Sequence, residues 1–379
     1  RLIQRVRREG DRGIAHRGRG KPSNRRIAEG VKAKVLQLYE KRYGDFGPTL
    51  AAEKLAERHG IAISDETVRL WLRERGIDHF KRRKRPHRAW RARKAHVGEL
   101  IQLDGSHHDW LEGRGPHGVL MAYIDDASSR VFARFYEYEG TIPAMDSFGR
   151  YVTRYGIPLA VYADKHTTYR SPVEPTMEEQ LTGAAPTSQF GRALGELGVE
   201  LIPAHSPQAK GRIERLFGTF QDRLIKEMRL AGISTLEEAN RFVEAYLPIY
   251  NQRFGVKPVQ PADLHRPLWA GCALDGILCV KTPRVLRNDF TVAYEGALYQ
   301  IEENLRAKRV MVEERVDGSK WITYHGRTLR YHAIAARPVR STETKEVHQL
   351  QRRVKPTSDH PWRKRLLPAR AKHAAAPST

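Results

Sequence analysis

Apolar residues recur at helical spacing in three short stretches near the start of the chain. The ranges 27–43, 48–59 and 64–76 each place apolar side chains three and four residues apart, which predicts three amphipathic helices. Pro48 suits a first helical position and Ser64 suits an N-cap. Short helices in this order predict a helix-turn-helix fold, although an ordinary three-helix bundle gives the same pattern.

The pattern changes to strands from residue 98 onward. The segments ELIQLDG, GVLMAYIDDAS and RVFARFYEYE are apolar runs separated by turns, which predicts an antiparallel meander. Helices near 142–155 and 188–197 then alternate with the strands PLAVYAD and VELIP, and a long helix follows from 207. This order predicts a mixed α/β sheet with helices on both faces. Ligands of such sheets gather at the carboxyl ends of parallel strands.

The domain boundaries follow from these changes of pattern. After a helix at 235–252, short alternating strands with glycine turns predict a small β-barrel, and the basic, non-periodic end predicts a disordered tail. The chain opens without Met in what reads as mid-helix, so we expect part of an N-terminal domain to be missing. In order, we expect a remnant of a first helix-turn-helix with a basic linker (1–26), a helix-turn-helix DNA-binding domain (27–78), a basic linker (79–97), an α/β domain (98–232), a helical connection (233–267), a small β-barrel (268–336) and a basic tail (337–379).

Positive charge is concentrated at the two ends of the chain. The formal net charge of the 379 residues is +23. Residues 1–97 carry 28 Lys/Arg against 11 Asp/Glu, and residues 336–379 carry 11 against 3, so the part between them is nearly neutral. A generally basic protein would not segregate charge in this way. The layout predicts a polyanionic partner, double-stranded DNA, which the two basic ends of the chain bind outside the catalytic site.

Candidate DNA contacts lie on the third helix and in the first basic linker. The linker sequence HFKRRKRPHRAWRARKA interleaves basic and aromatic residues without apolar periodicity, which favours a segment that follows a phosphate backbone over a merely solvated charge run. The candidates are Thr67, Arg69, Arg73, Arg75, Lys81, Arg82, Arg83, Lys84 and Arg85.

Three acidic residues form the candidate chemical site. Asp104 and Asp164 each close an apolar strand, and in each strand the alternation of side chains directs the acid away from the apolar residues. If the two strands pair in parallel, both acids emerge at one rim. Glu214 lies at the edge of the apolar stripe of the long helix, for which Ser206 is the expected N-cap. Any one of these acids could instead be solvated or paired, Glu214 for example with Lys210.

Five segments of the chain resemble DDE-type transposases and retroviral-type integrases, in particular bacterial insertion-sequence transposases of the ISNCY type. They are LIQLDGSHHDWLEGRG, YIDDASSR, YADKHTTY, QFGRAL and HSPQAKGRIERLFGTFQDRL. The resemblance covers nearly the whole chain. It implies that residues 98–232 form an RNase H-like catalytic domain, and that Asp104, Asp164 and Glu214 are its catalytic and metal-binding acids.

Glu200 competes with Glu214 for the third position. Many relatives in the superfamily space the second and third acids by about 35 residues, which here falls on Glu200. Glu200 opens the strand VELIP, however, and lacks the KGRIER approach of Glu214. The surplus length fits the Pro/Gly-containing loop at 171–186. We therefore expect Glu214 to be the third acid.

Oxygen-rich ligands of this kind select Mg²⁺ or Mn²⁺, and two ions can serve the attacking and the leaving oxygen of a phosphodiester. We expect Asp104 to bridge two ions, with Asp164 and Glu214 each completing one coordination sphere. Lys210 and Arg212 are expected near the DNA backbone. The resemblance implies hydrolysis at the transposon's inverted-repeat ends, followed by attack of the freed 3′-hydroxyl on target DNA. Pairing two ends predicts a homo-multimer on DNA. We also expect the protein to be located in the bacterial cytoplasm, associated with the nucleoid.

Other readings are weaker. Cys272 and Cys279 are too few for a disulfide framework or a zinc site, and no apolar stretch reaches the length of a membrane span. Asp125 and Asp126 suit a hairpin turn. His107, His108 and Asp109 follow Asp104 closely enough to touch substrate or water, but no His/Cys partner spacing supports zinc. A DNA-binding regulator without catalysis and a metal-dependent nuclease without joining activity remain alternatives to a transposase.

Overall fold

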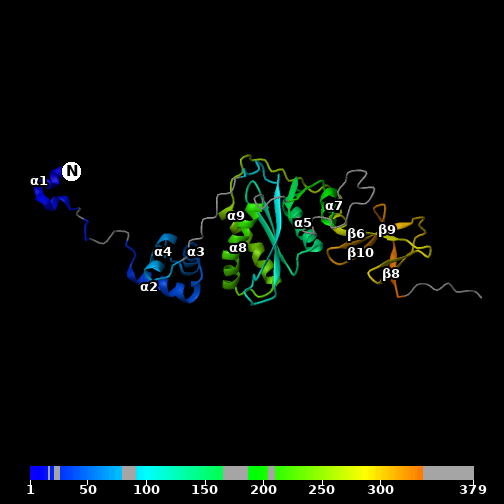
Figure 1. The fold of residues 1–379 in the computed structure, drawn as a ribbon, viewed down its shortest axis with the longest axis horizontal. Helices are drawn as coiled ribbons and strands as arrows, with labels where there is room; N and C mark the ends of the chain where they lie inside the picture. Colours follow the sequence, from blue (N-terminus) through cyan, green and yellow to red (C-terminus); the bar gives the residue numbers. More distant parts are fainter. Residues whose placement is uncertain (16–17, 21–25, 79–90, 165–186, 204–209, 336–379) are drawn as a thin grey trace, which may run out of the picture. The chain divides into compact units, whose positions relative to one another are not determined.

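A computed structural model describes most of the chain (Figure 1). The described residues are 1–15, 18–20, 26–78, 91–164, 187–203 and 210–335. The chain divides into two compact units, of which the first comprises Arg1–Pro283 with Val310–Leu329 and the second Arg284–Arg309 with Arg330–Thr379. The candidate site lies entirely in the first unit.

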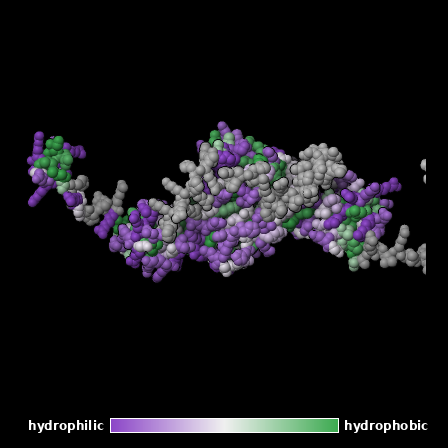
Figure 2. Space-filling model, viewed as in Figure 1, coloured by the Kyte–Doolittle hydropathy of each residue, from purple (hydrophilic) through white to green (hydrophobic). Residues whose placement is uncertain are grey.

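The first unit begins with short helices. They are α1 (Leu2–Glu9), the 3-10 helix η1 (Gly10–Ile14), α2 (Glu29–Leu38), the π-helical turn η2 (Tyr39–Tyr43), α3 (Pro48–His59) and α4 (Asp65–Glu74). We call residues 28–78 the helical module. Its side-chain core includes Val35, Phe46, Leu55 and Leu72. On the face seen in Figure 2, hydrophilic residues cover most of this module.

The boundaries of α3 and α4 follow from local chemistry. Pro48 opens α3, where its missing N–H costs no hydrogen bond, and Gly60 ends it in the left-handed conformation at φ 65°. Ser64 caps α4 by accepting a hydrogen bond from the Thr67 amide at 3.1 Å. The prediction of three helices in this region is confirmed, with the first ending in the π-helical turn η2.

The centre of the unit is a five-stranded mixed sheet with the order β3-β2-β1-β4-β5. Strands β1 and β2, and β2 and β3, pair antiparallel, whereas β4 is parallel to β1 and β5 is parallel to β4. This is the strand order and direction of an RNase H-like fold, as the resemblance implied. The strands are β1 (Ile101–His108), β2 (Gly118–Asp125), β3 (Val131–Tyr136), β4 (Ala160–Ala163) and β5 (Glu200–Pro203).

Helices cover both faces of this sheet (Figure 1). One apolar core joins the sheet to α5 (Thr141–Tyr155) and α7 (Gln189–Glu196), and a second joins it to α8 (Gly211–Leu230) and α9 (Leu236–Phe254). Each face is thereby shielded from water, so only the strand ends and the sheet edges remain open to a ligand.

Two asparagines of α9 bond the backbone of the edge strand β3. The Asn240 carboxamide accepts from the Phe135 amide at 2.7 Å and donates to the Phe135 carbonyl at 3.0 Å. Asn251 does the same with Val131, at 2.7 and 2.8 Å. The side chains therefore satisfy backbone groups that an edge strand would otherwise leave unpaired.

The carboxyl-terminal strands form two open sheets. After α10 (Leu274–Ile277) come β6 (Cys279–Val285), β7 (Thr291–Tyr294), β8 (Ala297–Ile301), β9 (Arg309–Arg315), β10 (Lys320–Tyr324), β11 (Arg327–Thr328) and β12 (Tyr331–Ile334). Their orders are β11-β10-β9-β6 and β12-β8-β7. The expected barrel is not confirmed, because neither sheet closes on itself in the described part of the chain. Alternation and glycine turns predict strands, but not which strands pair.

Within the described ranges, no helix combines the length and the apolar character needed to cross a bilayer.

Candidate active site

Asp104 and Asp164 leave the sheet beside each other. Strands β1 and β4 pair in parallel with Ile101 opposite Val161 and Gln102 opposite Tyr162. Two residues further along the same register, Asp104 comes opposite Asp164. Leu103 and Ala163, which directly precede the two acids, belong to the apolar core with α5 and α7. Because side chains alternate along a strand, both acids point to the opposite face, toward α8. The parallel pairing assumed in the sequence analysis is confirmed.

One ammonium group lies between the two aspartates. The Lys210 Nζ is 3.1 Å from Asp104 Oδ1 and 2.9 Å from Asp164 Oδ2. The Lys210 side chain is 10% exposed, that of Asp104 20% and that of Asp164 55%. The place where the two carboxylates converge is thus occupied by a cation from the chain itself.

Burial and charge act against each other in this contact. Burial raises the pKa of Asp104 above its usual value, and the Lys210 charge offsets only part of that rise. Burial would lower the pKa of Lys210, but the hydrogen bond to Asp164 and the charge of Asp104 outweigh it, so the pKa of Lys210 is raised. The lysine is therefore held as an ammonium ion.

Glu214 lies in the first turn of α8, and its side chain is exposed. That turn is tied to β1, because the Gln102 side chain accepts a hydrogen bond from the Ile213 amide at 3.3 Å. Among the described residues, no three metal-ligating side chains lie close enough to share an ion. The structure therefore brings together Asp104 and Asp164, with Glu214 on the adjoining turn. The expected cap Ser206 lies outside the described residues.

A further acid near the site, Asp126, is completely buried. Its Oδ1 atom accepts hydrogen bonds from Gln102 at 2.9 Å and from Arg212 at 2.7 Å, and it also contacts Arg91. Its Oδ2 atom accepts from the Lys94 amide at 2.8 Å. Asp126 therefore joins three segments, the chain that enters the sheet domain, strand β1 and the start of α8.

Turn chemistry explains the local contacts of Asp125 but not those of Asp126, and Asp125 Oδ2 also accepts a hydrogen bond from the distant Gly98 amide at 2.9 Å. Asp125 accepts hydrogen bonds from the Ser128 amide at 2.7 Å and from the Ser128 hydroxyl at 2.6 Å, as an aspartate in a turn does. Asp126 has the long-range role described above. No signal in the sequence distinguishes the two, because the partners of Asp126 are remote in the chain.

Glu139 is a further carboxylate near Asp104 that sequence reasoning missed. Its oxygen would lie 2.6 Å from a Cβ atom placed on Gly105, and its charge contributes to the raised pKa of Asp104. It also pairs with His107 Nε2 at 3.0 Å. Its place at the end of β3, in the sequence YEYEG, was the available signal.

The candidate DNA contacts on α4 have partners within the helical module. Arg69 pairs with Glu66 at 2.5 Å, and Arg75 with Glu40 at 3.4 Å. Thr67 takes part in the cap of the helix, and Arg73 is exposed.

The remaining candidates are either buried or outside the described residues. Arg212 is 9% exposed, and burial lowers its pKa while its charge is paired with Asp126. Its described role is thus in the interior, beside the start of α8. Lys81, Arg82, Arg83, Lys84 and Arg85 lie outside the described residues.

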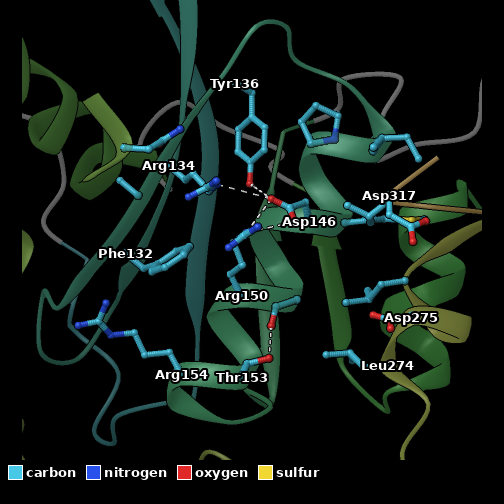
Figure 3. A pocket seen from close by; sticks show the side chains of 18 of the residues that line it. Phe132, Arg134, Tyr136, Asp146, Arg150, Thr153, Arg154, Leu274, Asp275 and Asp317 are labelled. Atoms are coloured by element: carbon cyan, nitrogen blue, oxygen red, sulfur yellow. Dashed lines mark hydrogen bonds and ion pairs between the residues drawn. The ribbon is translucent and has the colours of Figure 1, made fainter. Parts of the chain in front are cut away.

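A hollow of about 1120 Å³ lies away from the acids, with walls from β3, α5, α9 and α10 (Figure 3). On its wall the Tyr136 hydroxyl donates to Asp146 Oδ2 at 2.6 Å, and Arg150 pairs with the same carboxylate. Burial, together with that hydrogen bond, raises the pKa of Tyr136 well above its usual value. None of Asp104, Asp164 and Glu214 lines the hollow.

Two relatives align with most of the chain. The protein named transposase y4bF in Sinorhizobium fredii (strain NBRC 101917 / NGR234) is 38% identical over 341 residues, which are 88% of this chain and 74% of that protein. The transposase for insertion sequence IS1202 of Streptococcus pneumoniae is 28% identical over 405 residues, covering 94% of this chain and 84% of that protein. Residues 1–72 also match the family described as a homeodomain-like domain. The chain belongs to the transposase family of these relatives.

Solved structures with some likeness are more distant. The HTLV-2 integrase catalytic core domain in complex with magnesium is 16% identical, covers 39% of this chain and 84% of its own, and gives a TM-score of 0.28. A chain of the simian T-cell lymphotropic virus intasome in complex with PP2A regulatory subunit B56 gamma is 13% identical, covers 80% of this chain and 100% of its own, and gives 0.33. The order and directions of the five strands are what define the RNase H-like fold of this sheet.

Proposed function

We propose that the chain cleaves transposon ends and joins them to target DNA, with Asp104, Asp164 and Glu214 as its catalytic acids. The observation that carries the proposal is the convergence of Asp104 and Asp164 on the Lys210 ammonium at the ends of two adjacent parallel strands. Two carboxylates aimed at one cation are the donor set that a hard divalent ion needs. Family membership supplies the type of reaction.

The proposed metal is Mg²⁺ or Mn²⁺, with two ions per site. Asp104, Asp164 and Glu214 would hold them. Bound divalent ions supply charge stabilisation for the attacking and leaving oxygens of a phosphodiester. The residues fit this group, because Asp104 and Asp164 already hold a cation and Glu214 lies one helical turn after the lysine that provides it.

The remaining residues orient the site. Gln102 ties the first turn of α8 to β1, and Asp126 holds Gln102 and Arg212 in the interior. In the first step water attacks the phosphorus at the transposon end, and the bond to the 3′-oxygen breaks. In the second step that 3′-hydroxyl attacks a target phosphorus, and a target strand leaves with its own 3′-hydroxyl. No bond to the protein forms in either step.

The proposed partners are the inverted-repeat ends, target DNA and further copies of the chain. The homeodomain-like match over residues 1–72 supports DNA reading by the helical module, with Thr67, Arg69, Arg73 and Arg75 as its contacts. The basic segments 79–97 and 337–379 would then bind phosphate, as would Lys210 once it is released from the aspartates.

The test is incubation of the full chain with Mg²⁺, DNA carrying the ends of its own element, and a target plasmid. Joined products support the proposal, and chelation of the metal with EDTA should abolish them. Nicked but unjoined DNA would point to a nuclease. Binding with neither product would point to a DNA-binding regulator.

Removing the Lys210 charge should strengthen metal binding. In Lys210→Gln no ammonium competes with the ion between Asp104 and Asp164, and one unit of positive charge is about 4 kcal/mol at 4 Å in a partly buried setting. After allowance for solvent screening, we expect the dissociation constant for Mn²⁺ to fall about tenfold, measured by isothermal titration calorimetry. Lys257→Gln, at an exposed position, is the control and should change nothing. Unchanged or weaker binding in Lys210→Gln would contradict the assignment.

A further inference from the structure

Helix α8 connects the candidate active site at its first turn with the helical module at its last turns. Glu214 lies in its first turn, next to the N-cap Lys210 that contacts the aspartates, and its last turns contact the helical module. From Glu214 to Glu227 the rise along an α-helix is about 20 Å. One continuous helix thus runs from the candidate active site to the module that carries α4, the helix with the proposed DNA contacts.

The contact between α8 and α3 is ionic, and much of it is buried. Arg223 donates two parallel hydrogen bonds to the Glu53 carboxylate, from Nη2 to Oε1 at 2.5 Å and from Nη1 to Oε2 at 2.9 Å, and Glu53 also contacts Arg253 of α9. Lys54 Nζ lies 2.7 Å from Glu227 Oε1, with both side chains less than 10% exposed. Fork-shaped arginine pairs fix geometry as well as adding energy, and buried pairs tolerate the loss of one partner poorly.

Apolar and aromatic contacts complete this interface. Leu230 at the end of α8 packs against the core of the helical module. The buried ring of Phe46 has Lys226 Nζ 5.6 Å and the Arg229 guanidinium 5.8 Å from its centre. Arg229 also reaches Asp45 at 2.5 Å. The module side of the interface is built from α3 and the turn before it.

Helix α4 is held in the helical module by contacts with α2 and with the start of α3. Its Glu74 pairs with Lys32 of α2 at 2.6 Å, and its Asp65 accepts from Thr49 at 3.1 Å. Leu70 and Arg73 of α4 are exposed. The interface with α8 therefore leaves an outer face of α4 open to DNA.

We propose that the contact of α3 with α8 is a fixed joint that holds α4 at a constant separation from the acidic site, so that the protein cuts at a set distance from the sequence it reads. Glu53, Lys54, Arg223 and Glu227 are its positioning residues. The joint itself is independent of the proposed function, whereas its effect on the cutting distance rests on that function. In this proposal the length of α8 sets the distance between α4 and the acidic site.

Spin labels test the joint without any DNA. With Cys272 replaced by Ser, labels on Glu29→Cys and Arg241→Cys report one distance between the helical module and α9, measured by double electron–electron resonance on the full chain. Both positions are exposed. We expect a single narrow distribution. A broad distribution in the otherwise unchanged chain would overturn the joint, whatever the protein does to DNA.

Charge reversal tests which residues hold the joint between α3 and α8 together. Glu53→Arg places three arginines together and should broaden the distribution, while the exchange Glu53→Arg with Arg223→Glu should narrow it again. Glu40→Arg, on the same module but away from α8, is the matched control. Circular dichroism checks that each variant is folded. A distribution that stays narrow in Glu53→Arg would overturn the role of these residues.

The cutting distance is read on end-labelled DNA. Glu53→Arg should bind the ends as tightly as the parent chain, but cut them about 10²-fold more slowly and at scattered positions. The exchange variant should restore one position. An unchanged cutting pattern in Glu53→Arg would overturn the positioning role. If the parent chain itself cuts nothing, the proposed function fails, and the spin-label result decides the joint by itself.

Discussion

Replacement of Asp104 by Asn should abolish DNA cleavage and strand transfer while DNA binding and the fold are retained. Asn has nearly the same size, so the packing of β1 is kept, but the charge that holds a cation is lost. Loss of metal-derived stabilisation worth several kcal/mol predicts a rate lowered by about 10³-fold or more. Quantifying joined products with end-labelled DNA measures the loss, and a filter-binding assay confirms that DNA is still bound.

Matched carboxylate variants decide which acids belong to the site. Asp164→Asn and Glu214→Gln should fall in the same range as Asp104→Asn. Glu200→Gln changes an exposed acid on β5 and should keep the parent rate. Full activity in Glu214→Gln together with an inactive Glu200→Gln would move the third acid to Glu200.

Replacement of Asp126 by Ala should destabilise the protein strongly. It leaves Arg212, which is 9% exposed, without its carboxylate, and it removes the acceptor of the Gln102 amide and the Lys94 amide. Breaking a buried ion pair by removing one partner costs about 3–5 kcal/mol. Urea unfolding followed by circular dichroism measures the free energy of unfolding.

An exposed ion pair provides the comparison for Asp126. Glu237 pairs with Arg241 one turn away, and its side chain is 82% exposed. Glu237→Ala should change the free energy of unfolding by about 0.5 kcal/mol or less. Equal losses in the Glu237 and Asp126 variants would show that Asp126 is not the buried anchor that its contacts indicate.

The sequence predicted well those features that depend on nearby residues. Pro48 and Ser64 begin their helices by local hydrogen bonding and fixed backbone angles, so both starts were predictable. The alternation in LIQLD and LAVYAD placed Asp104 and Asp164 on one face because side-chain direction in a strand has a period of two.

Features that depend on distant residues were not predictable. Asp126 reads as a turn residue, because its partners Arg91 and Arg212 are 35 and 86 positions away. Arg212 reads as a DNA contact for the same reason, since charge alone does not reveal burial. The barrel was expected from strand and turn signals, but closure depends on hydrogen bonds between strands that those signals do not specify.

The asparagines along β3 limit how copies of this chain can assemble. A bare edge strand invites a second copy to add its own strand and continue the sheet. Here Asn240 and Asn251 already occupy backbone groups that such a neighbour would need. At Val131 and Phe135, the β3 edge is therefore closed to a strand added by another copy of the chain, and with it to the strand-by-strand growth that leads to fibrils.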